Sequence, residues 1–313
     1  MSATDVWLPL PPDEFDDLPG AFTYRYWNAD GPHPADPADC LAYVVPYLRP
    51  PADVLAPLER MRSVRLVQTL TAGTEHMLPG LAALPPGAVL CNAVGVHDAS
   101  TAELALTLIL ASLRGVPDFV RQQDAGRWRG GFRPALADRR VLIVGYGGIG
   151  RAVEERLLPF EVARVDRVAR TARAERHGPV QSLDALPTLL PEADVVVVAV
   201  PLTEGTRHLV DAGFLARMPD GALLVNVARG GVVDTKALLP ELESGRLRAA
   251  LDVTDPEPLP EDHPLWRAPG VLITPHVGGP STAFRPRARA LVRAQLDRLA
   301  AGEPPGHVVH RAA

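Results

Sequence analysis

The chain has 313 residues, of which 47% are hydrophobic and 22% are charged, and its formal net charge is -5. This length exceeds the roughly 250 to 300 residues that one hydrophobic core usually serves, so two domains are expected. The composition is that of a folded globular protein, and the absence of a basic stripe excludes nucleic acid or an anionic membrane surface as a partner.

The first residues contain no basic segment followed by an apolar one, and no run of 18 apolar residues occurs in the sequence. A cytoplasmic protein without a membrane span is therefore expected. Cys40 and Cys91 are the two cysteines, which suit neither a disulfide framework nor a four-ligand zinc site, and both are expected in the core. His307 and His310 are expected on a surface tail, and the sequence predicts no metal site.

The first 60 residues are rich in proline, which limits them to short strands and loops. Residues 64–70 predict a buried strand, and Thr71-Ala72-Gly73-Thr74 then supplies small residues typical of a ligand-binding loop. Residues 101–113 form helix readily and are apolar on nearly every side, which predicts a hinge helix buried between domains or subunits. Glu103 in this helix is expected to anchor structure through hydrogen bonds.

Strand-like and helix-like segments alternate from residue 141 to residue 276, and the strands are almost unbroken apolar runs. This alternation predicts a parallel sheet covered by helices on both faces. The final helix, at about 282–301, is expected to return to the first domain.

Gly145, Gly147 and Gly150 form a G-x-G-x-x-G pattern between an apolar strand at 141–144 and an amphipathic helix. The first glycine allows a tight turn, the second lets a pyrophosphate approach the backbone, and the third lets helix and strand pack closely. Unpaired amides at the helix start then hold the phosphates. The context favours dinucleotide binding over a simple glycine-rich turn.

Three further motifs follow this fingerprint in order: NVARGG at 226–231, LDVTDPEP at 251–258 and TPHVGG at 274–279. Ala72-Gly73, Asn92, the TAE of 101–103 and the VPLTEGT of 200–206 fit the same pattern. Together the motifs resemble the D-isomer-specific 2-hydroxyacid dehydrogenases. The resemblance implies an α/β fold with two Rossmann-like domains and doubly wound parallel sheets. A flavodoxin-like substrate domain would span 1–98, completed by about 285–313, and a dinucleotide-binding domain would span 99–284.

The resemblance places catalysis on Arg229, Glu257 and His276. Arg229 suits the substrate carboxylate and keto oxygen because its cationic fork can engage both. His276 suits the proton donor because its intrinsic pKa lies near neutrality, and Glu257 would orient it and favour its protonated form. Backbone amides of Ala72 and Gly73 would complete the carboxylate site. Taken singly, the three residues also fit a salt bridge, a solvated loop carboxylate and a capped loop histidine.

The resemblance also assigns Asp252 to the nicotinamide carboxamide, although Asp252 equally suits a cap of the loop that follows its strand. The remaining residues that it assigns to the cofactor site are Tyr146, Gly148, Ile149, Val200, Pro201, Thr206, Val227, Ala228 and Gly278, together with Arg229 and His276.

Cofactor preference depends on the end of the second strand of the fingerprint unit. An acid about 20 residues past the glycines normally accepts hydrogen bonds from the adenosine ribose of NAD and repels the extra phosphate of NADP. That position falls near Val168, whereas Arg170, Thr171 and Arg173 follow and suit a 2'-phosphate. NADP is therefore expected over NAD, with Asp166 as the competing ribose ligand and a solvated arginine surface as the alternative.

These features predict an oxidoreductase that interconverts a small 2-keto acid and its 2-hydroxy acid with NAD(P)H. A homodimer is expected around the helix at 101–113. Two alternatives remain: the same fold acting on another oxyanion such as phosphite, and a non-enzymatic nucleotide-sensing protein that resembles the C-terminal-binding-protein corepressors.

Overall fold

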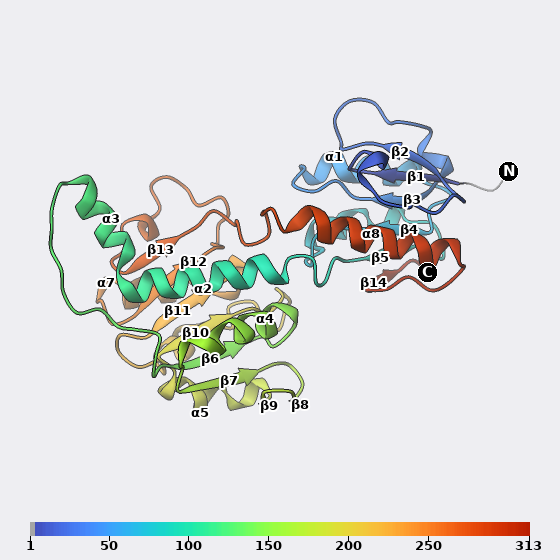
Figure 1. The fold of residues 1–313 in the computed structure, drawn as a ribbon. Helices are drawn as coiled ribbons and strands as arrows, with labels where there is room; N and C mark the ends of the chain where they lie inside the picture. The colour runs from blue at the N-terminus through green and yellow to red at the C-terminus, as the bar shows by residue number, and fades with distance from the viewer. Residues whose placement is uncertain (1–3) are drawn as a thin grey trace. The chain divides into compact units, whose positions relative to one another are not determined.

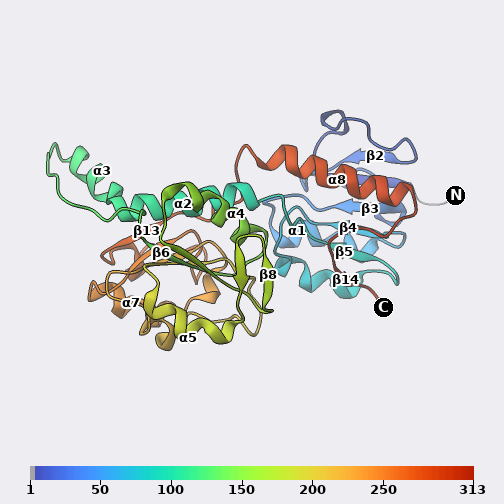
Figure 2. The same cartoon turned by 60° about the horizontal axis from the view of Figure 1, so that its bottom comes forward.

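A computed structural model describes residues 4–313. The chain divides into two compact units: the first comprises the described residues up to His97 together with Thr282–Ala313, and the second comprises Asp98–Ser281 (Figures 1 and 2). Each unit is built on a six-stranded sheet, and the strands within each sheet are almost all parallel. The predicted α/β class with two doubly wound sheets is confirmed.

The sheet of the first unit has the order β14-β5-β4-β3-β1-β2, with β14 antiparallel to β5. The order 2-1-3-4-5 of its parallel strands is that of flavodoxin-like folds. Its elements are β1 (Asp5–Leu8), β2 (Thr23–Tyr26), β3 (Cys40–Val44), α1 (Pro51–Leu55), β4 (Leu66–Gln68), β5 (Val89–Cys91), α8 (Phe284–Ala300) and β14 (Val308–Arg311).

Two predictions for the first unit have different outcomes. Both cysteines are buried, as expected. The prediction of a surface tail at His310 is wrong, because β14 adds to the edge of the sheet and pairs His310 with Leu90. Alternation of polar and apolar side chains is weak in this short strand, so its pairing was not apparent from the sequence.

The sheet of the second unit has the order β13-β12-β11-β10-β6-β7 and is parallel throughout. Its strands are β6 (Arg140–Val144), β7 (Arg164–Val168), β10 (Val195–Val198), β11 (Leu223–Asn226), β12 (Arg248–Leu251) and β13 (Val271–Ile273). Its helices are α2 (Asp98–Arg114), α3 (Val116–Asp124), α4 (Gly148–Leu157), α5 (Leu186–Leu189), α6 (Ala212–Leu215) and α7 (Thr235–Glu243). A hairpin of β8 (Arg173–Glu175) and β9 (Gly178–Val180), which the sequence did not predict, follows β7.

Short 3-10 segments complete the chain, at Pro12–Glu14, Pro37–Asp39, Leu58–Arg60, Glu75–Ala83, Leu158–Phe160, Leu183–Ala185, Leu190–Glu192, Gly230–Val232 and Pro264–Trp266.

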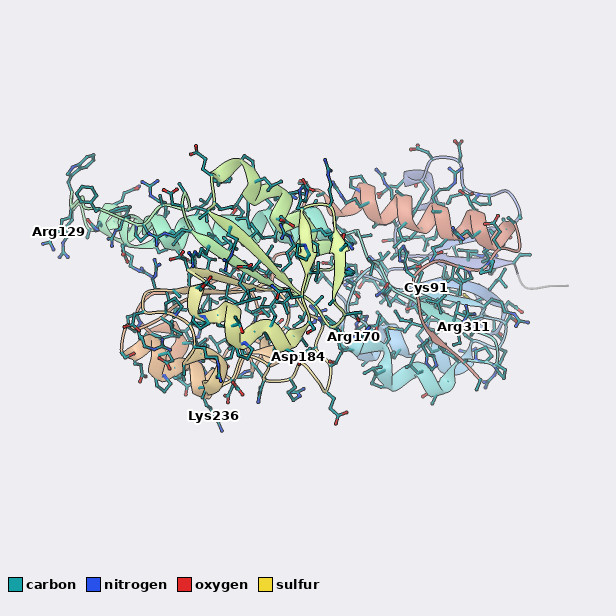
Figure 3. The ribbon with its side chains drawn as sticks, turned by 90° about the horizontal axis from the view of Figure 1, so that it is seen from below. Cys91, Arg129, Arg170, Asp184, Lys236 and Arg311 are labelled. Carbon is teal, nitrogen blue, oxygen red and sulfur yellow. The ribbon has the colours of Figure 1, made fainter. Side chains whose placement is uncertain are left out.

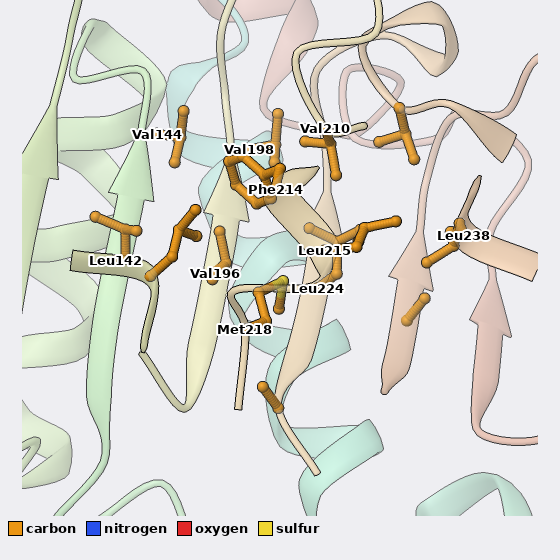
Figure 4. Packing of buried hydrophobic residues seen from close by; sticks show 14 of the residues in the cluster. Leu142, Val144, Val196, Val198, Val210, Phe214, Leu215, Met218, Leu224 and Leu238 are labelled. Carbon is orange, nitrogen blue, oxygen red and sulfur yellow. The ribbon is translucent and has the colours of Figure 1, made fainter. Parts of the chain in front are cut away.

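The strands of the second sheet are apolar on both faces because both faces are covered. Leu142 and Val196 face one core, together with Phe214 and Leu215 of α6 (Figure 4). Their neighbours Val141 and Val195 face a second core that α2 and α4 complete. Successive strand residues point to opposite faces, so a strand buried on both sides reads as a continuous apolar run.

Helix α2 is buried along one face within this chain. Ala102, Ala105 and Ile109 are fully buried, but Glu103 and Thr107 are exposed. Helix α2 packs one face on α4 and the sheet and leaves the other face partly open within this chain, so burial of that second face by another subunit stays a prediction. The expectation that Glu103 anchors structure fails, since its side chain makes no hydrogen bond within residues 4–313.

The segment from α3 to residue 132 stands away from the sheet of the second unit (Figure 1). It carries exposed apolar side chains: Trp128 and Phe132 are fully exposed, and Phe119 and Val120 are partly so. In the described part of the chain no single helix has the length and apolar character needed to cross a membrane. Only α2 and α3 taken together, with a bend of 67° between them, meet that requirement.

Candidate active site

The carboxyl ends of the parallel strands gather most of the predicted site residues of the second unit. The glycine turn follows β6, Arg170 follows β7 and Val200 follows β10. Arg229 follows β11, Asp252 and Glu257 follow β12, and His276 follows β13. All these strands are parallel, so the loops after them lie along one edge of the sheet, where open α/β sheets bind ligands.

The glycine turn has the geometry that its pattern predicts. Gly145 adopts a φ of +106°, and a Cβ there would lie 2.5 Å from the Ala199 carbonyl oxygen. At Gly150 a Cβ would lie 2.3 Å from the Gly145 oxygen, whereas at Gly147 it would meet nothing within 4 Å. The first and third glycines are therefore required by packing, and the second leaves open space beside the start of α4.

The start of α4 offers unpaired donors. The amides of Gly148, Ile149 and Gly150 have no acceptor within residues 4–313, and the first main-chain bond there runs from Arg151 to the Gly147 oxygen. These amides, together with the helix dipole, fit the phosphates of a dinucleotide.

The unpredicted β8–β9 hairpin braces this turn. Arg173 donates to the Tyr146 carbonyl oxygen over 2.5 Å and to Glu175 over 2.7 Å. Glu175 also accepts from Arg151, the residue after the last glycine. The hydrogen bonds from Arg151 and then Arg173 lower the pKa of Glu175 to about 2, so this carboxylate is ionised across the physiological range. Arg173 therefore holds the turn, whereas the sequence assigned it to a 2'-phosphate.

A buried polar cluster lies behind the turn. The fully buried Glu154 accepts a hydrogen bond from the Tyr146 hydroxyl and two from Arg167. Burial, and then the bond to Glu154, raise the pKa of Tyr146 to about 12. Each charged group in this cluster has a partner, as a buried ion pair requires.

Arg170 is exposed beyond the end of β7, and its side chain makes no hydrogen bond or ion pair within residues 4–313 (Figure 3). Thr171 is exposed as well, and its carbonyl oxygen accepts from the Arg173 guanidinium over 3.3 Å. Asp166, the competing ribose ligand, lies within β7 and pairs with Arg164 over 2.7 Å. The carboxylate two residues before the strand end is therefore already engaged.

Arg229 is positioned by a braced turn. The buried Asn226 accepts from the Ala228 amide over 3.0 Å and donates to the Arg229 carbonyl oxygen over 3.0 Å. The Arg229 guanidinium donates to the Ala228 oxygen over 2.7 Å. A Cβ at Gly230 would lie 1.8 Å from the Thr254 oxygen, so this turn packs directly on the loop that leads to Glu257. The bracing role of Asn226 was missed, although NVARGG contains it.

His276 and Glu257 form a hydrogen-bonded pair, with Nδ1 of His276 2.5 Å from the Glu257 carboxylate. This hydrogen bond raises the pKa of His276, against the opposing effects of burial and of the Arg229 cation. Burial opposes ionisation of Glu257, but the bond to His276 and the charges of His276 and Arg229 keep the pKa of Glu257 below its usual value. His276 has a φ of +53°, a conformation that is uncommon for a histidine and is held by the surrounding loop.

Asp252 holds that loop. It is buried, and its carboxylate accepts from the Thr274 hydroxyl over 2.6 Å and from the amides of Val277 and Gly278 over 2.9 Å each. Its carbonyl oxygen accepts from the His276 amide over 2.8 Å. Of the two roles considered for Asp252, these contacts are those of a loop cap.

The other predicted cofactor residues line the same edge of the sheet. Thr206 donates to the Pro201 oxygen over 2.6 Å and accepts from the Thr203 amide over 2.8 Å, which closes the loop after Val200. Val227 and Ala228 are buried between β11 and the Arg229 turn.

In the first unit, the loop after β4 presents amides. The amides of Ala72 and Gly73 have no acceptor within residues 4–313, whereas the Ala72 oxygen accepts from the Asn92 side chain over 2.9 Å and the Gly73 oxygen from Thr71 over 2.6 Å. A loop with occupied carbonyl groups and unpaired amides suits an anion. Separately, residues 4–313 contain no group of three His, Cys, Asp or Glu residues arranged to hold a metal ion.

Comparisons with known proteins agree with this chemistry. Residues 106–278 match the family described as D-isomer specific 2-hydroxyacid dehydrogenase, NAD binding domain. The chain is 32% identical over 251 residues to glyoxylate reductase/hydroxypyruvate reductase of Homo sapiens, covering 77% of this chain and 76% of the relative. It is 33% identical over 258 residues to glyoxylate reductase of Thermofilum pendens, covering 80% of this chain and 76% of the relative.

Among solved structures, the fold is similar to that of a D-isomer specific 2-hydroxyacid dehydrogenase from Xanthobacter autotrophicus Py2 in complex with NADPH and MES. The TM-score is 0.78 at 30% identity, and the match covers 99% of this chain and 98% of that chain.

Proposed function

Because this chain belongs to the D-isomer-specific 2-hydroxyacid dehydrogenase family, and is an NAD(P)H-dependent hydroxyacid oxidoreductase, we propose that its substrate is a small 2-keto acid of the glyoxylate or hydroxypyruvate type. The observation that carries the proposal is the His276–Glu257 pair beside the Arg229 cation. Such a set provides a proton donor and a carboxylate receptor at one edge of the sheet.

In the proposed reaction, bound NAD(P)H supplies the hydride that goes to the keto carbon. Nδ1 of His276 is engaged by Glu257, so Nε2 is the atom that gives a proton to the keto oxygen as the carbon–oxygen double bond is reduced. The Arg229 guanidinium binds the carboxylate and polarises the ketone. In the first unit, the unpaired amides of Ala72 and Gly73 also suit a carboxylate. The unpaired amides at the start of α4 and the open space at Gly147 fit the cofactor phosphates.

A turnover assay with glyoxylate, hydroxypyruvate and pyruvate tests this proposal. We expect oxidation of NADPH or NADH with at least one of them, at a rate that depends on the keto acid concentration. Cofactor binding without turnover of any keto acid would instead support a nucleotide-sensing protein. Turnover of phosphite alone would support the other alternative.

We propose that NADPH is preferred over NADH, with Arg170 as the main contact of the 2'-phosphate. The support is that Arg170 and Thr171 are exposed just past β7, while Asp166 pairs with Arg164. The NADPH complex of the Xanthobacter relative is consistent with this preference. Arg173 is already bonded to Glu175 and to the turn, so we give it a bracing role.

The two arginines are expected to behave differently when replaced by alanine. Arg170→Ala should raise KM for NADPH by about tenfold and leave KM for NADH almost unchanged, because only NADPH carries the phosphate. Arg173→Ala should weaken the binding of both NADPH and NADH, since it loosens the turn that holds the phosphates common to both. Steady-state kinetics with each cofactor measure the difference. A wild-type preference for NADH, or equal losses in Arg170→Ala, would contradict the assignment.

We also propose a homodimer. The support now comes chiefly from the exposed segment 116–132, because Trp128 and Phe132 are fully exposed and a second copy of the chain would cover them. Sedimentation should give the mass of two chains at micromolar concentration, and Trp128→Ser together with Phe132→Ser should shift that mass towards one chain. A one-chain mass for the wild type would contradict the dimer.

A further inference from the structure

His97 lies in the first unit and is separate from the His276–Glu257 pair that would supply the proton. It is buried, with 7% of its surface exposed, and its Nε2 lies 2.8 Å from the Leu70 carbonyl oxygen. Its ring is parallel to that of Phe284, at 5.4 Å between centroids and 2° between planes, and it stacks on Tyr47 at 5.5 Å. Because a carbonyl oxygen only accepts, Nε2 carries the proton in this contact.

Leu70 begins the loop that presents the Ala72 and Gly73 amides. Four consecutive carbonyl groups of this loop have donors: Leu70 from His97, Thr71 from the Thr69 hydroxyl over 3.0 Å, Ala72 from Asn92 and Gly73 from Thr71. The carbonyl groups are therefore held inside the unit, whereas the amides of Leu70–Gly73, including those of Ala72 and Gly73, have no acceptor within residues 4–313. His97 provides the first of these restraints.

The stacked rings of His97, Phe284 and Tyr47 lie next to both crossovers, the two points at which the chain leaves the first unit and re-enters it. His97 is the last residue of the first unit before α2, and Phe284 begins α8, two residues after the chain re-enters the unit at Thr282. Phe284 stacks on Tyr47 at 4.3 Å, so each of the three rings contacts the other two. Both crossovers are thus anchored to the residue that opens the amide loop.

We propose that His97 is a positioning residue: it fixes the amide-presenting conformation of the Leu70–Gly73 loop and ties that loop to both crossovers, and so sets the affinity for the substrate carboxylate. This inference rests on the proposed function for its substrate. The ring stack and the hydrogen bond are separable, because one depends on the aromatic ring and the other on Nε2–H.

Three variants separate these contributions. His97→Phe keeps a ring and removes the donor, His97→Asn keeps a donor and removes the ring, and Phe284→Leu keeps His97 and removes its stacking partner. The matched control is Tyr43→Phe, which deletes another buried hydrogen bond of the same unit, from the Tyr43 hydroxyl to the Val54 oxygen over 3.0 Å, away from the loop.

With saturating NADPH, His97→Phe should raise KM for glyoxylate about tenfold with kcat changed less than about threefold, because a buried carbonyl loses its donor and the loop relaxes. His97→Asn and Phe284→Leu should raise KM less, and Tyr43→Phe should leave it unchanged. The dissociation constant for NADPH, measured by fluorescence, should be the same in all four. An unchanged KM in His97→Phe, or an equal rise in Tyr43→Phe, would overturn the proposal.

Amide hydrogen exchange of the segment 70–74 provides a test that needs no turnover. His97→Phe should speed exchange in this segment relative to wild type, and Tyr43→Phe should not. A wild-type chain inactive on every 2-keto acid would overturn the proposed function, and the exchange rates would still decide the positioning role. Unchanged exchange in His97→Phe would overturn that role.

Discussion

Replacement of His276 by alanine is expected to lower kcat for 2-keto acid reduction by about 10² to 10⁴, the usual contribution of a positioned general acid. The dissociation constant for the cofactor should change little, because the phosphates are expected at the start of α4 and not at the imidazole. Steady-state kinetics and a fluorescence titration with NADPH measure the two quantities.

The matched control is His177→Ala. His177 also pairs with a glutamate, with Nε2 2.7 Å from Glu155, but it lies in the turn between β8 and β9 and not in the loops after β11 and β13 that carry Arg229 and His276. Its loss should leave kcat unchanged. Retention of more than about a tenth of wild-type turnover by His276→Ala would refute the proton-donor assignment, because it falls outside the usual contribution of a general acid.

The pH dependence of the reaction should report the His276–Glu257 pair. The hydrogen bond to Glu257 raises the pKa of His276, so the protonated donor persists to higher pH and reduction declines only as pH rises through this raised value. Glu257→Gln removes the principal cause of the shift. The alkaline limb of kcat against pH should therefore move to lower pH, with a smaller loss at low pH. An unmoved limb would show that Glu257 does not tune the donor.

Replacement of Arg229 by glutamine is expected to lower kcat/KM by about 10² to 10⁴. Two charge-assisted hydrogen bonds, to the carboxylate and the keto oxygen, contribute about 1.5 to 3 kcal/mol each, and a tenfold change corresponds to about 1.4 kcal/mol. Arg229→Lys keeps the charge and loses the planar fork, so its loss should be intermediate.

Arg217→Gln is the control for Arg229. The Arg217 guanidinium also donates to a nearby carbonyl, that of Gly213 over 2.7 Å, but it is exposed and outside the strand-end loops. In steady-state kinetics, kcat/KM of Arg217→Gln should be near that of wild type, that of Arg229→Lys should be lower, and that of Arg229→Gln should be the lowest. Full activity of Arg229→Gln would remove this residue from substrate binding.

The sequence predicted the strands that are buried on both faces. It missed the elements that are held by contacts to main-chain atoms far away in the sequence. Apolar runs such as Val195–Val198 are buried on both faces, so the local sequence alone is enough to identify them as strands. Each strand of the β8–β9 hairpin has three residues, too few to show a periodicity, and the hairpin is held by contacts of Arg173 and Glu175 to the glycine turn and to Arg151. For helix α2, composition reports apolar character but not which face the chain itself covers.

The candidate site divides in the same way. Arg229, Glu257 and His276 lie at strand ends that their motifs identified, and the structure brings His276 and Glu257 within hydrogen-bond distance. Asn226 in the second unit and His97 in the first unit are single polar residues whose partners are main-chain carbonyl or amide groups. Such partners have no side-chain identity, so the sequence pattern does not reveal them.

The Asp252 carboxylate lowers the reorganisation energy that the His276 loop requires to reach the transition state. It anchors Thr274, Val277 and Gly278 to the end of β12 through bonds that need no ligand, so the strained backbone at His276 is set during folding. The imidazole is thus preorganised, and little reorganisation energy is required of the loop when the proton moves. Binding energy from the substrate is left for orienting the keto acid itself.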